Sequence, residues 1–228
     1  ITSLKWCPDG ERFISCDSNS TVSIWRLSSN DKFEKYQEYK AQEPIEFIDF
    51  KPTNIALSKD DSEGNNTSVT NDWIFFLVGN EGIVYVADDV GHMRVAFNMK
   101  SPIAAFLQYE EKNTFVALTF KSVLALYEVD DDLNIKQTMR SKINVSTGGN
   151  CSDLKGLWVG QGVMATCANE TLIRVWNLDT DDSYQLTASD IRDPIINIAF
   201  NPRKRVLSGV TTTGTIYSWQ FVGSETDP

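Results

Sequence analysis

The sequence predicts an all-β fold, specifically a β-propeller. Three observations support this prediction. A strand-like phrase recurs along the 228 residues, its spacing is nearly regular, and short apolar runs separated by polar turns stand before each copy. The final bulky position of each copy marks the repeat, with successive separations of 61, 41, 49 and 43 residues, at Trp25, Val86, Tyr127, Trp176 and Trp219. Three of these separations are close to the ~40–45 residues of a four-stranded propeller blade.

Each repeat is expected to begin with two buried strands. The runs are short, nearly continuous in apolar residues and rich in β-branched side chains, which is typical of strands covered on both faces. A polar turn with Pro, Asp, Asn or Gly follows the first strand, as Cys7-Pro8-Asp9-Gly10 does. First strands are expected in 1–10, 45–52, 102–111, 153–162 and 194–202, and second strands in 12–18, 73–80, 114–120, 163–169 and 205–213.

A marker strand and a polar outer strand complete each repeat. The marker strands lie in 20–27, 81–89, 121–129, 170–178 and 214–221. The outer strands alternate polar and apolar residues, as a half-solvated edge strand does, in 32–40, 92–100, 134–142 and 183–189.

The cycle predicts one partial WD40-type propeller over residues 1–228, with about five blades of a seven-bladed ring. The blades are expected near 1–40, 45–100, 102–142, 154–189 and 194–221. An exposed insertion at 52–72, rich in Asp, Ser, Asn and Gly, accounts for the long first separation. Because the chain begins with Ile1 rather than Met, we expect it to be an internal piece of a longer protein.

The repeats are divergent. A regular WD blade carries a Gly-His pair and ends in Trp-Asp, and these groups form a hydrogen-bonded network. No repeat ends in Trp-Asp, and the lone histidine, His92, follows a marker strand in a polar segment. We therefore expect packing of the aromatic markers between blades to supply more of the stability, at Trp25, Trp176 and Trp219. Tyr127 is the corresponding marker of the third blade.

Composition excludes several functions. The net charge of −10 argues against a nucleic-acid partner, which needs a basic face. No apolar run approaches the ~20 residues of a membrane helix, and no signal peptide is visible. Cys7, Cys16, Cys151 and Cys167 form no C-x-x-C pair, so buried reduced thiols in the cytoplasm are expected rather than a zinc site. Six N-x-S/T sequons are the only feature that favours secretion, at Asn19, Asn65, Asn66, Asn144, Asn150 and Asn169.

The sequence offers no catalytic, cofactor-binding or metal-binding residues. No Ser-His-Asp or Cys-His arrangement can be assembled around the single histidine, and no phosphate-binding glycine motif is present, so no small-molecule substrate is expected. His92 is interpreted as an exposed loop or edge residue. The runs Asp130–Asp132 and Asp179–Asp182 suggest calcium, but the loop counted from Asp179 has Tyr184 where an EF-hand needs Gly and Asp190 where it needs Glu. Turn chemistry explains both runs better.

One basic turn, Arg203-Lys204-Arg205, stands out against the acidic background. It is either a solvated hairpin tip or a contact for an acidic protein partner or an anionic membrane surface.

Two long stretches, "WIFFLVGNEGIVYVADDVGHMRVAFNMKSPIAAFLQYEEKNTFVALTFKSVLALYEV" (73–129) and "GVMATCANETLIRVWNLDTDDSYQL" (162–186), are similar to the first propeller of the intraflagellar transport protein 140 family. The opening "ITSLKWCPDGERFISCDSNSTVSIWRL" resembles that family's third blade, and the polar insertion falls where the family carries one. The resemblance rests on the order of phrases and the insertion, not on one motif.

The resemblance implies a non-enzymatic scaffold. Family members assemble with other complex A subunits, serve retrograde transport and the entry of membrane cargo into cilia, and are found in the cytoplasm, axoneme and basal body. It therefore implies partner subunits of a multiprotein transport complex, and membrane cargo adaptors as further partners. A coat or vesicle-trafficking scaffold is the alternative in the same class, and a secreted propeller enzyme or lectin is the alternative from a different class.

Overall fold

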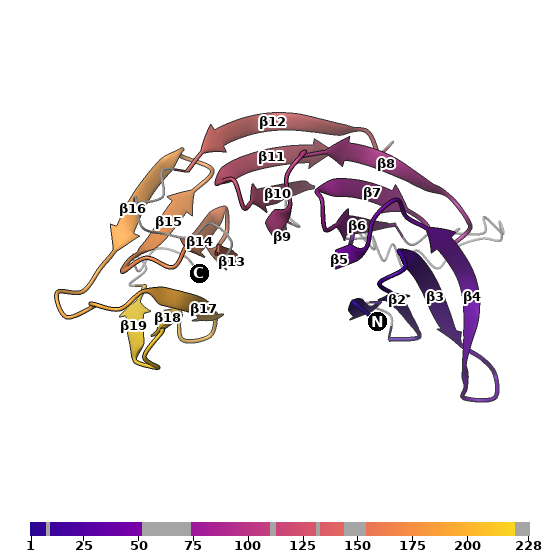
Figure 1. The fold of residues 1–228 in the computed structure, drawn as a ribbon, viewed down its shortest axis with the longest axis horizontal. Coiled ribbons are helices and arrows are strands. Elements are labelled where there is room, and N and C mark those ends of the chain that lie inside the picture. Colours follow the sequence, from indigo (N-terminus) through magenta and orange to yellow (C-terminus); the bar gives the residue numbers. More distant parts are fainter. Residues whose placement is uncertain (8–9, 52–73, 110–112, 131–132, 144–153, 222–228) are drawn as a thin grey trace, which may run out of the picture. The chain divides into compact units, whose positions relative to one another are not determined.

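The computed structural model describes residues 1–7, 10–51, 74–109, 113–130, 133–143 and 154–221 (Figure 1). In these residues, 19 strands form five antiparallel sheets, four with four strands and one with three. The prediction of an all-β fold is confirmed. The chain divides into two compact units, Ile1–Lys100 and Ser101–Pro228.

The first unit holds two sheets, each a meander in chain order. One sheet consists of β1 (Ser3–Trp6), β2 (Arg12–Cys16), β3 (Thr21–Leu27) and β4 (Phe33–Lys40). The other consists of β5 (Ile45–Phe50), β6 (Phe75–Gly79), β7 (Ile83–Ala87) and β8 (Met93–Asn98).

The second unit holds three sheets of the same topology. Its first sheet is β9 (Ile103–Tyr109), β10 (Thr114–Thr119), β11 (Val123–Val129) and β12 (Ile135–Lys142). The next is β13 (Lys155–Gly160), β14 (Val163–Cys167), β15 (Ile173–Asn177) and β16 (Asp182–Leu186). The last is β17 (Ile195–Asn201), β18 (Val206–Thr211) and β19 (Ile216–Gln220).

The strands lie inside the segments in which the sequence predicts them, except that β16 begins one residue early, at Asp182. Turn residues set the ends of several strands. Asp17 accepts hydrogen bonds from the backbone N–H groups of Asn19 (2.9 Å) and Thr21 (2.8 Å), which closes the β2–β3 turn. These bonds lower the pKa of Asp17. The expected insertion at 52–72 lies outside the described residues.

The core of the first unit forms where its two sheets pack face to face. Alternate residues of β2 and β3, including Ile14 and Ile24, are buried against the second sheet, which contributes Phe75, Leu77 and Tyr85. Every residue of β6 is buried, and so is every residue of β10 in the second unit. Both strands therefore behave as the apolar runs predict, since burial on both faces requires continuous apolar sequence.

Among the described residues of the second unit, two clusters of buried apolar side chains join neighbouring sheets. One joins β9–β12 to β13–β16 and includes Leu124, Ile143 and Met164. The other joins β13–β16 to β17–β19 and includes Ile173, Val175 and Leu207. The outer strand of a sheet is mostly exposed, as predicted, because one of its edges and much of its side-chain surface face solvent.

Two tryptophan markers make the same hydrogen bond in different units. The indole N–H of Trp25 donates to Ser15 Oγ (2.8 Å), and that of Trp176 donates to Thr166 Oγ1 (3.0 Å). Each acceptor stands ten residues earlier, on the neighbouring strand. This repeated bond gives two divergent repeats a common local structure.

The packing of the markers is not uniform. Trp176 packs on the cluster between β9–β12 and β13–β16, and Trp219 packs on the cluster between β13–β16 and β17–β19. Tyr127 stacks on Phe115 of its own sheet. Trp25 stacks on Phe13 of its own sheet.

The described cysteines are buried thiols. Cys16 and Cys167 lie in β2 and β14, and Cys7 directly follows β1. Burial raises the pKa of Cys16 and of Cys167 to about 12 each, so both are protonated and unreactive at neutral pH. Cys151 lies outside the described residues.

Candidate functional site

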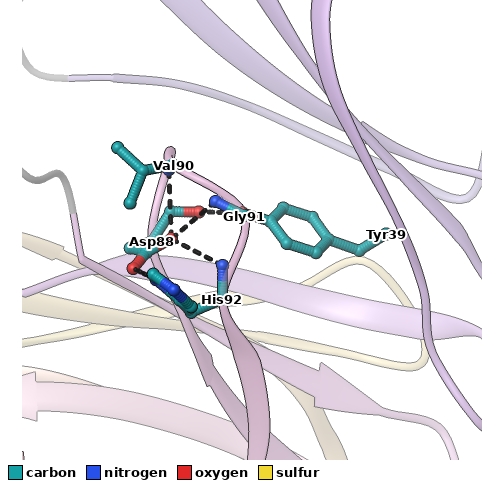
Figure 2. A network of polar contacts seen from close by, with 5 residues as sticks. All are labelled: Tyr39, Asp88, Val90, Gly91 and His92. Carbon is teal, nitrogen blue, oxygen red and sulfur yellow. Dashed lines mark hydrogen bonds and ion pairs between the residues drawn. The ribbon is translucent and has the colours of Figure 1, made fainter.

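The β7–β8 turn holds the lone histidine in a polar network (Figure 2). Asp88 Oδ1 accepts hydrogen bonds from the backbone N–H groups of Val90 (3.0 Å), Gly91 (2.9 Å) and His92 (2.8 Å). Asp88 Oδ2 lies 2.7 Å from His92 Nδ1. Burial by itself would raise the pKa of Asp88, but the hydrogen bonds from His92, Val90 and Gly91 outweigh it and lower the pKa.

Two contacts tie this turn to the preceding sheet. The Tyr39 hydroxyl, from β4, donates to the carbonyl of Asp88 and accepts a hydrogen bond from Gly91 N–H (3.2 Å). Burial, followed by the charge of Asp88, raises the pKa of Tyr39 to about 12, so the hydroxyl keeps its proton. Arg12 of β2 forms an ion pair with Asp89, and both side chains are nearly buried. The network thus fastens one sheet of the first unit to the other.

His92 has the surroundings of a turn residue. Its side chain is 84% exposed, and its carboxylate partner already accepts three backbone hydrogen bonds. Such an arrangement stabilises a turn and offers no aligned nucleophile. The interpretation of His92 as an exposed loop residue agrees with this geometry.

A second buried carboxylate, Glu43, comes from the segment between β4 and β5. Its Oε1 accepts hydrogen bonds from the backbone N–H groups of Glu81 (3.1 Å) and Ile83 (2.9 Å), in the β6–β7 turn. Gly79 makes this position possible, because a Cβ at Gly79 would lie 1.8 Å from Glu43 Oε1. This contact was not predicted from the sequence, since a Glu before a proline carries no signal of burial.

A third buried carboxylate lies in the second unit. Glu170 forms an ion pair with Arg174, and their side chains are only 5% and 10% exposed. Arg174 stands between Ile173 and Val175, both completely buried, on β15. The sequence analysis missed this pair as well, although an arginine inside a doubly covered strand is a usable signal, because a buried charge needs a partner.

The two acidic runs form turns. Asp130 Oδ1 accepts a hydrogen bond from Asn134 N–H (2.7 Å), as turn chemistry predicts, while 131–132 lie outside the described residues. In the second run, the side chain of the preceding Asn177 closes the turn. Its Oδ1 accepts from the N–H groups of Asp179 (3.0 Å) and Thr180 (3.2 Å), and Asp182 already belongs to β16. The described residues contain no group of three or more His, Cys, Asp and Glu side chains placed to hold a metal ion.

The basic turn lies between β17 and β18. Arg203, Lys204 and Arg205 are all exposed. The backbone of the turn is held on both sides, because Lys204 N–H donates to Asn201 Oδ1 (3.1 Å) and Gln220 Nε2 donates to the Lys204 carbonyl (2.7 Å). The turn therefore presents three cations on a fixed backbone.

A cavity of about 50 Å³ lies between the outer parts of β9–β12 and β13–β16. We call it the β12–β16 groove. Apolar side chains from both sheets and polar side chains of the β15–β16 turn line it: Leu124, Met139, Ser141 and Ile143 from the first sheet, and Trp176, Asn177, Leu178, Asp181, Asp182 and Ser183 from the second.

Comparison with known proteins decides the family. A family model described as the IFT140 first beta-propeller matches residues 53–227. This chain belongs to the IFT140 first-propeller family. The match covers most of the chain and agrees with the resemblance found in the sequence.

The fold of this IFT140 propeller is also that of WD40 proteins of known structure. The C-terminal WD40 domain of Sif2 matches with a TM-score of 0.68 and 15% identical residues. The match covers 97% of this chain and 57% of the Sif2 chain, so the present chain spans just over half of that structure. At this identity the similarity shows the fold alone.

In the IFT140 propeller, other polar groups stand at the turns where a regular WD blade has its network. Asp17 and Thr119 accept hydrogen bonds from backbone N–H groups in the turns before β3 and β11. Glu43, which lies between β4 and β5, accepts them in the turn before β7. No helix of the described residues is long and apolar enough to span a membrane.

Proposed function

We propose that this IFT140 propeller is a non-enzymatic protein-interaction scaffold in a multisubunit intraflagellar transport complex, complex A. The observation that carries the proposal is the family match over residues 53–227. We further propose that the full-length protein serves retrograde ciliary transport and the entry of membrane cargo, and that it is found in the cytoplasm, along the axoneme and at the basal body.

The construction of the sheets supports a scaffold. Buried or half-buried polar side chains close turns and join sheets. Asp88, Glu43 and Glu170 are examples. The turns stay accessible, and loops positioned by a rigid scaffold are where binding residues concentrate. The buried thiols of Cys16 and Cys167 favour a reducing compartment over a secreted enzyme or lectin.

Depletion and rescue in ciliated cells test the proposed transport role. Cells that lack the endogenous protein receive the full-length protein or the same protein without residues 74–221. We expect the full-length protein to restore retrograde movement and membrane-cargo entry, and the deletion to restore neither. Equal rescue by both proteins would refute a role of this propeller in transport.

We also propose that the turn Arg203–Arg205 contacts an acidic protein partner. Its three exposed cations project from an otherwise acidic chain, and such charges raise association rates and select partners. The triple change Arg203→Glu, Lys204→Glu and Arg205→Glu should lower the recovery of one partner subunit at low salt. The control Lys121→Glu, Lys136→Glu and Lys142→Glu reverses three exposed charges elsewhere. Unchanged recovery, or a loss of liposome binding instead, would count against an acidic protein partner.

A further inference from the structure

We propose that the β12–β16 groove binds a lysine or arginine side chain of a partner protein, with the aliphatic stem in the groove and the cationic head at its acidic rim. This inference rests on the proposed scaffold function, because it takes the occupant from another protein of the assembly. It is carried by the size, the lining and the charge of the groove.

The size of the groove selects the kind of occupant. Small-molecule and cofactor sites have volumes of ~300–1,000 Å³, whereas this groove has about 50 Å³. The space exceeds what one water molecule needs and is too small for a cofactor. This size therefore favours a single side chain of a partner over a small-molecule ligand.

The inner wall of the groove suits an aliphatic stem. Leu124 and Ile143 are 2% exposed each and form the buried end of the wall. Met139, Trp176 and Leu178 are half-buried and pack on the same core cluster. The hydrogen bond from Trp176 to Thr166 Oγ1 fixes the indole ring, so the wall is formed before a ligand arrives.

The rim of the groove suits a cationic head. Asp181 and Asp182 are exposed, and no salt bridge among the described residues involves either carboxylate. Asn177 holds the backbone of this turn through Asp179 and Thr180, which fixes where the two aspartates stand.

No lysine or arginine lines the groove. Arg140 and Lys142 flank Ser141 on β12, but side chains alternate along a strand, so both point to the other face of the sheet. An apolar wall below two carboxylates is complementary to a side chain that has an aliphatic stem and a positive end.

Carboxylate footprinting tests the proposal on the full-length protein, free and within the purified assembly. A carbodiimide with glycine ethyl ester labels accessible carboxylates, and mass spectrometry reads each position. We expect labelling of Asp181 and Asp182 to fall several-fold in the assembly, while labelling of the exposed Glu34 and Glu81 stays the same. Equal labelling of Asp181 and Asp182 in both forms would overturn the proposal.

Two variants of the full-length protein test separately how the cationic head and the aliphatic stem of the partner side chain contribute to binding. Asp181→Asn with Asp182→Asn keeps residue types that tolerate the positive φ of 58° at Asp181 and removes the charges. We expect it to weaken the affinity for one subunit roughly three- to tenfold at low salt, and less at high salt. The matched control is Glu34→Gln with Glu81→Gln, which should bind as the wild type does.

Ser141→Phe fills the groove without changing charge, and Ser29→Phe is its control at an exposed position outside the groove. Ser141→Phe should weaken the binding of the same subunit at every salt concentration. Thermal unfolding confirms that each variant is folded. Suppose that the assembly forms, and that neither Asp181→Asn with Asp182→Asn nor Ser141→Phe weakens the binding of any subunit. The groove proposal then fails while the scaffold function stands. If no transport subunit joins the wild-type protein, both proposals fail.

Discussion

Glu170 and Arg174 show how burial changes the effect of an ion pair. Both side chains are nearly buried, so removing one partner leaves an unpaired charge in the core. We expect Glu170→Ala to lower the free energy of unfolding by about 3–5 kcal/mol. In urea denaturation of the purified chain, Lys35→Ala is the control, because Lys35 and Glu38 are 47% and 50% exposed. Breaking that exposed pair should cost at most about 1 kcal/mol.

A double change completes this test. Glu170→Leu with Arg174→Met replaces both charges by apolar groups of similar size and should recover most of the lost stability. If Glu170→Ala costs no more than Lys35→Ala, the pair does not act as a buried ion pair.

Asp88 predicts a dependence of stability on pH. Its pKa is lowered in the folded chain, so its stabilising contribution is present above the unfolded value of about 3.9 and is lost as the pH falls through the folded value. We expect Asp88→Asn to lower the free energy of unfolding by about 1–2 kcal/mol at pH 7. The difference from the wild type should shrink below about pH 4, as measured by urea denaturation at several pH values. A difference that stays constant down to pH 2 would contradict this role, and the exposed Glu34→Gln is the control.

These side-chain contacts were only partly predictable from the sequence. His92 and Asp130 follow local rules, because their partners lie within four residues. Arg12 and Asp89 are 77 residues apart, and Glu43 lies 40 residues from Ile83. Pairs at such distances depend on how the sheets pack, which local patterns do not specify.

Among the strands and turns, Gly79 gives the sharpest test. A Cβ at the end of β6 would collide with Glu43, which would have to leave the N–H groups of Glu81 and Ile83. We expect Gly79→Ala to lower the free energy of unfolding by about 1–3 kcal/mol. Gly160, at the end of β13, is the control, because a Cβ there meets nothing closer than 3.7 Å. Similar effects of the two changes in thermal unfolding would refute the close contact at Gly79.

Strands were the most predictable feature, for a physical reason. Burial on both faces produces continuous apolar runs such as β6 and β10, and solvent on one side produces polar alternation such as β12. The packing of the markers was harder to predict. Trp25 and Trp176 share one local hydrogen bond, yet Trp25 stacks on Phe13 of its own sheet and Trp176 packs on the cluster between β9–β12 and β13–β16.

The 228-residue chain also carries a group of exposed large hydrophobic side chains on β1, β3 and β4. Leu4, Trp6, Leu27 and Phe33 are between 38% and 50% exposed. Exposed apolar patches promote association. We expect the purified 228-residue chain to associate as its concentration rises, and Trp6→Ser with Phe33→Ser to reduce this in sedimentation velocity. Val90→Ser with Tyr184→Ser is the control, since both side chains are exposed elsewhere. Identical sedimentation of all three proteins would contradict this expectation.

The β12–β16 groove lay beyond prediction from the sequence, because Ile143 and Trp176 belong to different sheets and meet only when those sheets pack. Its acidic rim was visible in the sequence as Asp179–Asp182, and the sequence analysis assigned that run to turn chemistry alone. Affinity for a partner needs the wall and the rim together, so neither part was informative by itself.

We propose that this propeller belongs to a scaffold of the ciliary transport machinery. Affinity purification of the full-length protein from ciliated cells, with quantitative mass spectrometry of the recovered proteins, tests it most directly. We predict a stoichiometric set of transport subunits, reduced when residues 74–221 are deleted. Recovery of the protein alone, or of vesicle-coat subunits in place of transport subunits, would contradict the claim.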